Sequence, residues 1–324
     1  MAAERPIAAT DTESAKRLLV GRDAPFSPDE GVAAIEKFAA EGDADALCTL
    51  ATLRGAGAWT RQSWPDALDL LQQAAELGSA LARSQLLVLS PDADLAASIR
   101  RGHNREPSRW RRLREPLDLQ AWITPQPPVK VLESPQAWVA ENFATPELCE
   151  WLISRVRGFN PALLLDRSTG VTSALDSRTC TDFVFDVLDG AIVMLLLRIK
   201  VSNVTTIPVP HMEPPQIFHY AVGQEIHPHH DFLSDGEQAY GADGTYMGDR
   251  LATFLMYLND GFEGGELEFP HAKHTHKGQI GDAIFFASQR NKVRDPMSLH
   301  GARPVTRGEK FILSQWIHDR PFAA

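Results

Sequence analysis

The sequence has few cysteines, no apolar stretch among its first residues and no long apolar run. The three cysteines, Cys48, Cys149 and Cys180, are odd in number and widely spaced, so they fit neither a disulfide framework nor a paired zinc site. The first residues, MAAERPIAATDTESAKR, contain no apolar stretch of the kind that signal peptides carry. Together these absences predict a protein of the reducing cytoplasm.

Positive charge is also in short supply. The 324 residues include 32 basic and 42 acidic side chains, a formal net charge of −10. This balance argues against broad binding to nucleic acid or to anionic membranes. The longest apolar run, AIVMLLL at 191–197, is far shorter than the ~20 residues that a membrane-spanning helix needs. A buried helix is the better interpretation of that run.

Residues 1–105 are rich in Ala and Leu, and they predict an all-α domain of short helices. Ser27-Pro28-Asp29-Glu30 has the pattern of a capping box, and a second helix is expected from Pro65 to the residue before Gly78. A weak repeat with a period near 36 relates the pairs Ile35/Leu71, Ala39/Ala75, Gly42/Gly78, Ala46/Ala82 and Leu50/Leu86.

This repeat resembles the tetratricopeptide-like helical repeats, in which small residues allow close helix packing. The alternative is a pair of ordinary helical hairpins in an Ala-rich protein. Only two copies are recognisable, whereas a free-standing solenoid needs about three or more. We therefore expect the helical array to depend on the rest of the chain.

A cluster of seven arginines with one tryptophan, Trp110, follows the helices. Such a run can contact RNA or an acidic partner, but a solvated helix or linker docked on the acidic remainder is favoured. The prolines at 125, 127 and 128 mark a boundary, so we expect a linker over 106–129 and a second domain over 130–324. The arginines are Arg100, Arg101, Arg105, Arg109, Arg111, Arg112 and Arg114.

The second domain has a different pattern. Helices are expected at 146–157 and 183–200, and short β-rich runs follow, separated by turns that contain Gly and Pro. Short strands without alternating helices are typical of an antiparallel sandwich or jelly roll, so the predicted fold class is α+β. The predicted strands are 216–222, 251–258, 266–269, 283–287 and 311–317.

The strongest candidates for a reactive site are His229 and Asp231. Residues i and i+2 of a strand face the same way, so both side chains can point into the mouth of a barrel. A later histidine such as His300 would complete a set of two imidazoles and one carboxylate, which suits iron(II) and leaves positions for substrate and oxygen. The His-x-acid pair alone is uninformative, because His211-Met-Glu213 has the same pattern.

Four segments supply the missing context: YAVGQEIHPHHDF, RLATFLMYLNDGFEGGELEFP, KGQIGDAIFF and SLHGARPVTRGEKFILSQWI. In order and spacing they resemble the prolyl 4-hydroxylase-type iron(II)- and 2-oxoglutarate-dependent dioxygenases, over about 216–317 and more weakly back to about 130. The resemblance implies a double-stranded β-helix. It also implies Fe(II) as the cofactor and 2-oxoglutarate and O2 as cosubstrates. Ascorbate is compatible with the resemblance as an additional cofactor.

The resemblance further implies roles for individual residues. His229, Asp231 and His300 would hold the iron, and Lys310 would pair with the distal carboxylate of 2-oxoglutarate. A carboxylate buried in a barrel needs a cation, because an unpaired buried charge is costly. Lysine provides a compact point charge for this purpose.

Four further residues are placed around the cosubstrate by the same resemblance. Tyr220 and Tyr257 align with tyrosines that flank it, and Thr253 and Trp316 line the same pocket. Arg178, in DSRTCTDF, matches a substrate-side arginine, although a surface salt bridge explains it equally well.

Other histidines near the motif are given ordinary roles. His230 should point away from the ligands, and His227 is expected to line the entrance. The three histidines of PHAKHTHKG are assigned to a polar hairpin loop rather than to a metal site; they are His271, His274 and His276.

Three functions are compatible with the sequence. The favoured one is a dioxygenase whose helical repeats recruit a protein or peptide substrate. A second keeps this chemistry but acts on a small molecule such as a free amino acid, and a third is a non-catalytic repeat scaffold with a degenerate barrel. Ile226 stands where prolyl hydroxylases usually carry tyrosine, so the residue bears on the choice of substrate. The loop Phe232–Gly248 is expected to form a lid.

Overall fold

The computed structural model describes residues 9–156, 158–161, 163–165, 172–174, 179–185, 189, 191–233 and 248–322. The chain divides into two compact units. The helical unit comprises Met1–Ile123 and Asp186–Arg198, and the sheet unit comprises Thr124–Phe185 and Ile199–Ala324. No helix in these described ranges has both the length and the apolar character to cross a bilayer.

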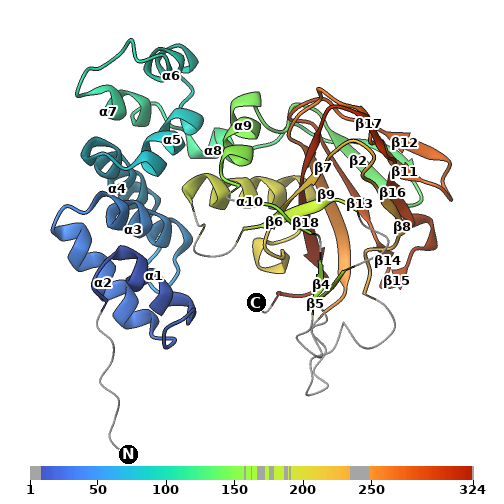
Figure 1. Ribbon diagram of the computed structural model, residues 1–324, viewed down its shortest axis with the longest axis horizontal. Helices are drawn as coiled ribbons and strands as arrows, with labels where there is room; N and C mark the ends of the chain where they lie inside the picture. The colour runs from blue at the N-terminus through green and yellow to red at the C-terminus, as the bar shows by residue number, and fades with distance from the viewer. Residues whose placement is uncertain are drawn as a thin grey trace, which may run out of the picture. The chain divides into compact units, whose positions relative to one another are not determined.

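The helical unit begins with a series of helices that follow one another as an antiparallel stack (Figure 1). α2 and α4 begin at Pro28 and Trp64, and α3 and α5 begin at Ala44 and Ala80, so both pairs are offset by 36 residues. The tetratricopeptide-like identity of these pairs stays a prediction. The helices are α1 (Thr12–Val20), α2 (Pro28–Ala40), α3 (Ala44–Ala56), α4 (Trp64–Leu77), α5 (Ala80–Leu89), α6 (Ala93–Arg100), α7 (Arg109–Arg114) and α8 (Leu119–Ile123).

Of the helix caps predicted from the sequence, one is confirmed and one is wrong. Gly78 ends α4 in the left-handed conformation at φ 117°, as expected for a glycine C-cap. The capping box expected at Ser27 is wrong, because its side chain makes no cap hydrogen bond. The backbone N–H of Ser27 donates instead to the carbonyl of Leu18 at 2.9 Å. Asp11 and Ser14 form a capping box at the start of α1.

The arginine-rich segment is folded against its neighbours rather than extended. Trp110 and Leu113 of α7 are buried, and the guanidinium groups of Arg83 and Arg109 lie 5.4 and 5.0 Å from the Trp110 ring. Arg112 pairs with Glu106 at 2.9 Å. The expected linker over 106–129 therefore contains two short helices, α7 and α8.

The apolar run at 191–197 lies in a buried helix, as predicted. It forms the first half of α10 (Ile192–Thr205), and this half belongs to the helical unit. The backbone N–H of Val193 is one of the donors that a helix start leaves without an intrahelical partner. The side-chain oxygen of Gln85, a fully buried residue of α5, accepts from it at 3.4 Å.

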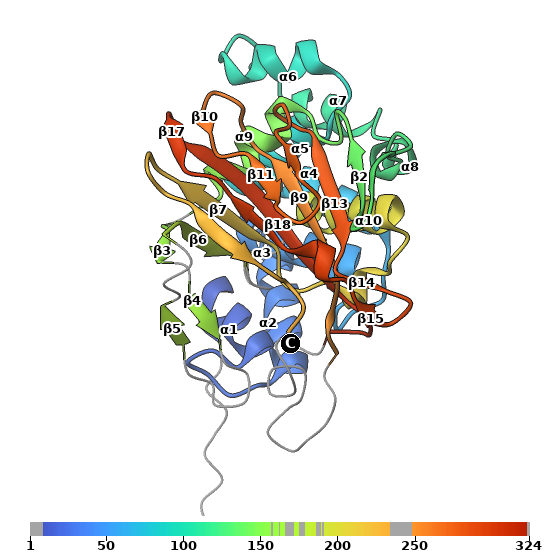
Figure 2. The same cartoon turned by 90° about the vertical axis from the view of Figure 1, so that its right-hand side faces the viewer.

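The sheet unit contains two main β-sheets. The first has eight strands in the order β1-β2-β13-β9-β18-β7-β6-β3, and the second has four in the order β12-β11-β16-β8. Figure 2 shows β7, β18, β9 and β13 side by side. The first sheet contains β1 (Val129–Glu133), β2 (Gln136–Ala140), β3 (Asn160–Pro161), β6 (Thr181–Val184), β7 (Gln216–Tyr220), β9 (Arg250–Tyr257), β13 (Ala283–Ala287) and β18 (Lys310–His318).

The second sheet and the short elements complete this unit. The second sheet contains β8 (Ile226–His229), β11 (Leu267–Phe269), β12 (His274–His276) and β16 (His300–Ala302). The small strand pairs are β4 (Leu163–Leu165) with β5 (Thr172–Ala174), β10 (Glu263–Gly264) with β17 (Val305–Arg307), and β14 (Gln289–Arg290) with β15 (Val293–Arg294). The helical elements are α9 (Pro146–Ser154), η2 (Val209–His211) and η3 (Pro296–Ser298).

The two sheets enclose one apolar core, which confirms the predicted jelly roll. Phe218, Phe286 and Trp316 of the first sheet contribute to the same buried cluster as Leu267 and Phe269 of the second. The central strands β13 and β18 are buried along most of their length on both faces.

Most predicted elements are confirmed, with one clear error. Each of the five predicted strands has a counterpart whose ends lie within two residues of the prediction, and α9 corresponds to the helix expected at 146–157. The helix expected at 183–200 is wrong at its start, because Phe183 and Val184 belong to β6 and pair with Ile217 and Gln216 of β7. Non-local strand pairing outweighs the local helical pattern there.

The contact between Gln85 and α10 generates a stability prediction. Replacing Gln85 by Met leaves the Val193 N–H buried without its acceptor, so the free energy of unfolding should fall by about 1–3 kcal/mol. Denaturant titration would measure the loss. The exposed Gln73 of α4 is the matched control, since Gln73→Met should change stability by less than about 0.5 kcal/mol. Equal effects of the two substitutions would contradict this role of Gln85.

Candidate metal centre and cosubstrate pocket

A cavity lies between the two sheets. Its lining includes eight predicted site residues, and Arg178 lies outside the described residues. The eight are His229, Asp231, His300, Lys310, Tyr220, Tyr257, Thr253 and Trp316.

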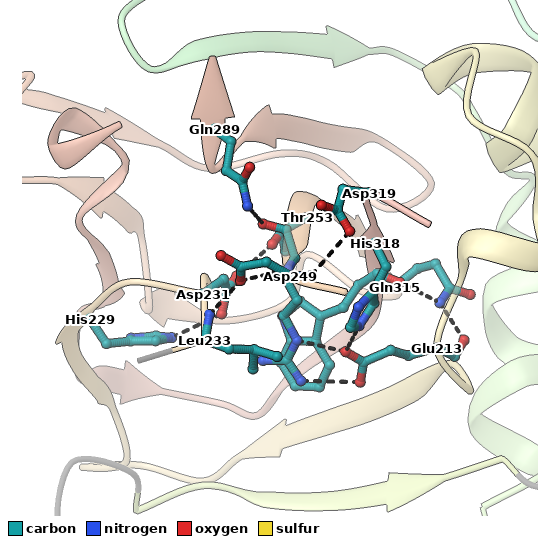
Figure 3. A network of polar contacts seen from close by, with 12 residues as sticks. Glu213, His229, Asp231, Leu233, Asp249, Thr253, Gln289, Gln315, His318 and Asp319 are labelled. Atoms are coloured by element: carbon teal, nitrogen blue, oxygen red, sulfur yellow. Dashed lines mark hydrogen bonds and ion pairs between the residues drawn. The ribbon is translucent and has the colours of Figure 1, made fainter. Parts of the chain in front are cut away.

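Strand register brings the two histidines of the triad together. His300 of β16 is paired directly with His229 of β8, and Asp231 lies two residues beyond the end of β8. Asp231 Oδ1 lies 3.5 Å from His229 Nε2, and Asp231 Oδ2 lies 3.4 Å from His300 Nε2. The three ligand atoms lie within 4.8 Å of one another. Figure 3 shows the His229 ring directed at Asp231.

Both imidazoles are oriented by backbone carbonyls. Nδ1 of His229 lies 2.9 Å from the carbonyl oxygen of His227, and Nδ1 of His300 lies 2.9 Å from that of Ser298. A carbonyl can only accept, so each Nδ1 must carry the proton. Each Nε2 therefore keeps its lone pair toward the space between the ligands, as metal-binding histidines require.

The Asp231 carboxylate is buried and incompletely satisfied. Thr253 Oγ1 donates to Oδ2 at 2.5 Å, while no described residue donates a hydrogen bond to the buried Oδ1. Burial favours the neutral acid, but the positive charge that His300, His229 and Arg250 can carry holds the pKa of the carboxyl well below its usual range. A divalent cation bound by the two Nε2 lone pairs would supply such charge in the same place. An ionised carboxylate with an open oxygen beside two imidazole lone pairs fits a divalent cation such as iron(II).

Lys310 supplies positive charge elsewhere in the cavity. It is 3% exposed, and its partner across the β18–β7 ladder is Tyr220. Its Nζ lies 4.8 Å from the centre of the Tyr220 ring and 5.9 Å from that of Tyr257, and it donates to the Gly265 carbonyl at 2.7 Å. Burial lowers the pKa of Lys310 to about 7. An anion in the cavity would restore its full charge.

Gly265 supports Lys310, a role that the sequence analysis does not identify. It has a positive φ of 67°, and a Cβ there would lie 3.1 Å from Lys310 Cδ. The absent side chain thus leaves room for the lysine stem, and the carbonyl anchors its ammonium. The Gly264-Gly265 pair indicates a turn, but no local signal indicates its contact with Lys310.

Tyr257 is held in place by its surroundings. Its hydroxyl donates to the His276 carbonyl at 3.3 Å. A Cβ on Gly278 would lie 2.6 Å from the tyrosine ring, so only glycine permits this close approach. Burial raises the pKa of the phenol above its ordinary value, so Tyr257 stays a neutral hydrogen-bond donor.

A buried ion pair supports Trp316 and is also missed by the sequence analysis. Glu213 accepts from Arg250 Nε at 2.7 Å and from Nη2 at 3.1 Å, and His318 Nε2 lies 2.6 Å from the same carboxylate (Figure 3). The Arg250 guanidinium lies 3.7 Å from the centre of the Trp316 ring. Glu213 belongs to the His-x-acid pair His211-Met-Glu213, which looks uninformative in the sequence. That pattern does not show that Glu213 pairs with Arg250.

The other histidines near the motif are not among the residues that line the cavity. His227 is exposed, and His230 stacks on Phe232 with ring centres 4.4 Å apart. His274 and His276 lie on β12 of the predicted hairpin, but they are half-buried rather than in a polar loop. Among the described residues, the only group of three metal-ligating side chains is the triad. Most of the expected lid, residues 234–247, lies outside the described residues.

Comparisons with known proteins agree with this chemistry. The family described as the 2OG-Fe(II) oxygenase superfamily matches residues 215–318. "Probable prolyl 4-hydroxylase 3" of Arabidopsis thaliana is 34% identical over 206 residues, which cover 57% of this chain and 69% of that protein. "Prolyl 4-hydroxylase 5" of the same plant is 34% identical over 210 residues, which cover 58% and 70%.

Solved structures include one similar protein with the cosubstrate. The viral collagen prolyl hydroxylase of Paramecium Bursaria Chlorella virus-1, in its 2OG complex, is 26% identical with a TM-score of 0.42. The match covers 56% of this chain and 94% of that chain.

The hydrogen bond from Thr253 generates a prediction about metal affinity. Thr253→Val keeps the shape of the side chain but removes the donor to Asp231, and loss of such a supporting contact should weaken divalent metal binding by about 10–100-fold. Calorimetric titration with Mn(II) measures this without turnover. The exposed Thr275 of β12 is the matched control, and Thr275→Val should bind as the parent does. Unchanged affinity in Thr253→Val would contradict the role of this bond.

The buried Glu213 predicts a pH-dependent stability. Burial opposes ionisation, but Arg250 and His318 lower the pKa of Glu213 to about 2. The stabilising effect of Glu213 is therefore fully present above about pH 4.3, which is the pKa of a glutamate in the unfolded chain. It is lost as the pH falls toward 2. Glu213→Gln should cost about 3 kcal/mol at neutral pH, and the difference from the parent should shrink below about pH 4.5.

Chemical denaturation at several pH values would measure that difference. The exposed pair of Glu263 and Arg307, at 2.6 Å, provides the control. Glu263→Gln should cost at most about 1 kcal/mol, because surface ion pairs are screened. A Glu213→Gln difference that stays constant down to about pH 3 would contradict the assignment.

Proposed function

Because this chain belongs to the prolyl 4-hydroxylase family of iron(II)- and 2-oxoglutarate-dependent oxygenases, we propose that it hydroxylates a prolyl residue of a peptide or protein. The chain is a 2-oxoglutarate-dependent dioxygenase that uses Fe(II). The observation that carries the proposal is the convergence of His229, Asp231 and His300 in the cavity that also holds Lys310.

The triad would hold the iron on one face. His229 and His300 present Nε2 lone pairs, and Asp231 presents the oxygen that no described residue satisfies. With iron, 2-oxoglutarate and O2 bound, the centre supplies an oxidant that converts a C–H bond into an alcohol, while the cosubstrate becomes succinate and CO2. Thr253 would keep the carboxylate in a single orientation during this reaction.

Lys310 would bind the distal carboxylate of 2-oxoglutarate. Its ammonium is confined by Tyr220, Tyr257 and the Gly265 carbonyl, so it offers a fixed point charge in a site of low dielectric. Apolar side chains such as Leu267 and Ile312 line the same cavity. They exclude water and strengthen the charge pairing.

Ile226 bears on the choice of substrate. It is 8% exposed and lines the cavity next to the triad, where it offers an apolar wall without a hydroxyl. The pyrrolidine ring of proline is compatible with such a wall and with the face of Trp316. A small molecule such as a free amino acid is the second candidate, since Ile226 stands where prolyl hydroxylases usually carry tyrosine.

We also propose that the helical unit recruits the substrate and that the protein works in the cytoplasm. The 36-residue offset of the helix pairs supports the first idea, because repeat arrays commonly bind peptides. The thiols of Cys48, Cys149 and Cys180 support the second, because all three are buried outside any disulfide.

One experiment tests the reaction and the substrate class together. The purified protein would be supplied with Fe(II), 2-oxoglutarate, O2 and either a library of proline-containing peptides or free amino acids. Mass spectrometry should find a gain of ~16 Da on prolyl peptides, and Asp231→Ala should abolish it because a triad has no spare ligand. Oxidation of free amino acids alone would overturn the peptide proposal but leave the dioxygenase assignment intact.

The depressed pKa of Lys310 predicts how cosubstrate affinity depends on pH. Since its pKa is about 7 before binding, and a carboxylate partner favours the ammonium, binding must take up a proton at higher pH. Affinity for 2-oxoglutarate should therefore fall by up to about tenfold per pH unit above 7. Lys310→Arg should bind more weakly but with little pH dependence, because arginine stays charged.

Anaerobic calorimetry with Mn(II) in place of iron would measure these affinities. Lys310→Ala should lose about 2–5 kcal/mol of cosubstrate binding, roughly 30-fold to a few thousand-fold, with little change in metal affinity. A parent affinity that is flat between about pH 6.5 and 9 would show that Lys310 is charged before binding. An unchanged affinity in Lys310→Ala would show that the carboxylate binds elsewhere.

A further inference from the structure

We propose that Arg294 is a positioning residue for the metal centre. It links the chain segment that follows Asp231 to the segment that leads to His300. The inference rests on the metal site proposed above, but it concerns a residue that lies outside the cavity lining.

Asp231 lacks the backbone support that the histidine ligands have. β8 ends at His229, so Asp231 lies beyond the last ladder pair with β16. A ligand outside a ladder must be held by contacts of its own segment. The next residues, Phe232 and Leu233, are where those contacts occur.

Both backbone polar groups of Leu233 are bound by one ion pair. Arg294 Nη2 donates to the Leu233 carbonyl at 2.6 Å, and Asp249 Oδ1 accepts from the Leu233 N–H at 2.7 Å. Arg294 Nε in turn donates to Asp249 Oδ2 at 3.2 Å. Figure 3 shows Asp249 reaching Leu233 from the start of β9. The pair therefore holds the chain two residues beyond Asp231.

A stack of side chains extends the same contact to His300. The Arg294 guanidinium lies 5.0 Å from the centre of the Phe232 ring, and Phe232 stacks on His230 with an interplanar angle of 19°. His230 Nδ1 lies 3.3 Å from Ser298 Oγ, and the Ser298 carbonyl accepts from His300 Nδ1 at 2.9 Å. The segments that carry Asp231 and His300 are thus joined through side chains as well as through strand pairing.

The chemistry of the contact requires arginine. One planar guanidinium provides donors for a carboxylate and a carbonyl while its face covers an aromatic ring. The lysine ammonium has three donors, but they radiate from one nitrogen, so it cannot make the same planar fork or cover the ring. Arg294→Lys should therefore restore only part of the function that Arg294→Met removes.

The test measures Mn(II) binding by the full-length protein. Loss of outer contacts that orient metal ligands costs about 10–100-fold in metal affinity, so Arg294→Met should fall in that range and Arg294→Lys between it and the parent. The matched control is Arg290→Met, on the exposed end of the same hairpin, and it should bind as the parent does. At saturating Mn(II), the electron paramagnetic resonance spectrum should change in Arg294→Met but not in Arg290→Met.

A double-mutant cycle separates positioning from general destabilisation. Asp249→Asn keeps an oxygen for the Leu233 N–H but removes the charge that faces Arg294. If the two groups act as one unit, the double variant should lose less Mn(II) affinity than the two single losses combined. Thermal unfolding in the presence of a chelator would measure how far each variant destabilises the metal-free fold, and Mn(II) affinity would be compared at a temperature at which all variants are folded.

The outcomes distinguish this inference from the proposed function. A parent that fails to bind Mn(II) would overturn the metal site and the inference with it. A parent that binds, with Arg294→Met within about twofold of it and with an unchanged spectrum, would overturn only the inference. An equal loss in Arg290→Met would do the same.

Discussion

A buried carboxylate is the constraint on which the rest of the cavity depends. Asp231 is 4% exposed, and an ionised group at that depth is costly unless donors or positive charge meet it. Thr253 satisfies one oxygen, while the other receives no hydrogen bond from the described part of the chain. A divalent cation would satisfy that oxygen and accept both imidazoles. Burial of the carboxylate and affinity for the metal therefore have the same physical origin.

Backbone geometry, more than side-chain packing, aims the two histidines. His229 and His300 are partners in one ladder, and each ring is turned by a carbonyl two residues earlier in the chain. A ladder fixes both position and direction, because its hydrogen bonds leave little freedom to the backbone. Asp231 lies past the ladder, and its neighbours Phe232 and Leu233 are held by side chains instead.

The fold was predictable where local sequence and final structure agree. The strands near 251–258 and 283–287 combine β-branched and aromatic residues with flanking turns, and both are present as β9 and β13. The prediction failed at the start of the helix expected at 183–200, where pairing with β7 decides the conformation of Phe183 and Val184. It also failed at Ser27, whose backbone is bound by Leu18 of the preceding helix. Both errors come from partners that a local pattern does not contain.

The sequence by itself determined the reaction class, because His229, Asp231, His300 and Lys310 lie in motifs whose order and spacing are legible along the chain. The resemblance of these motifs to the dioxygenase family also indicated the pocket residues Tyr220, Tyr257, Thr253 and Trp316. Only the tertiary structure decided which remote groups support them. The Glu213–Arg250 pair, the Gly265 carbonyl at Lys310 and the contact of Arg294 with Leu233 join segments far apart in the chain. Such contacts depend on how the sheets close, and no periodic signal in the sequence records them.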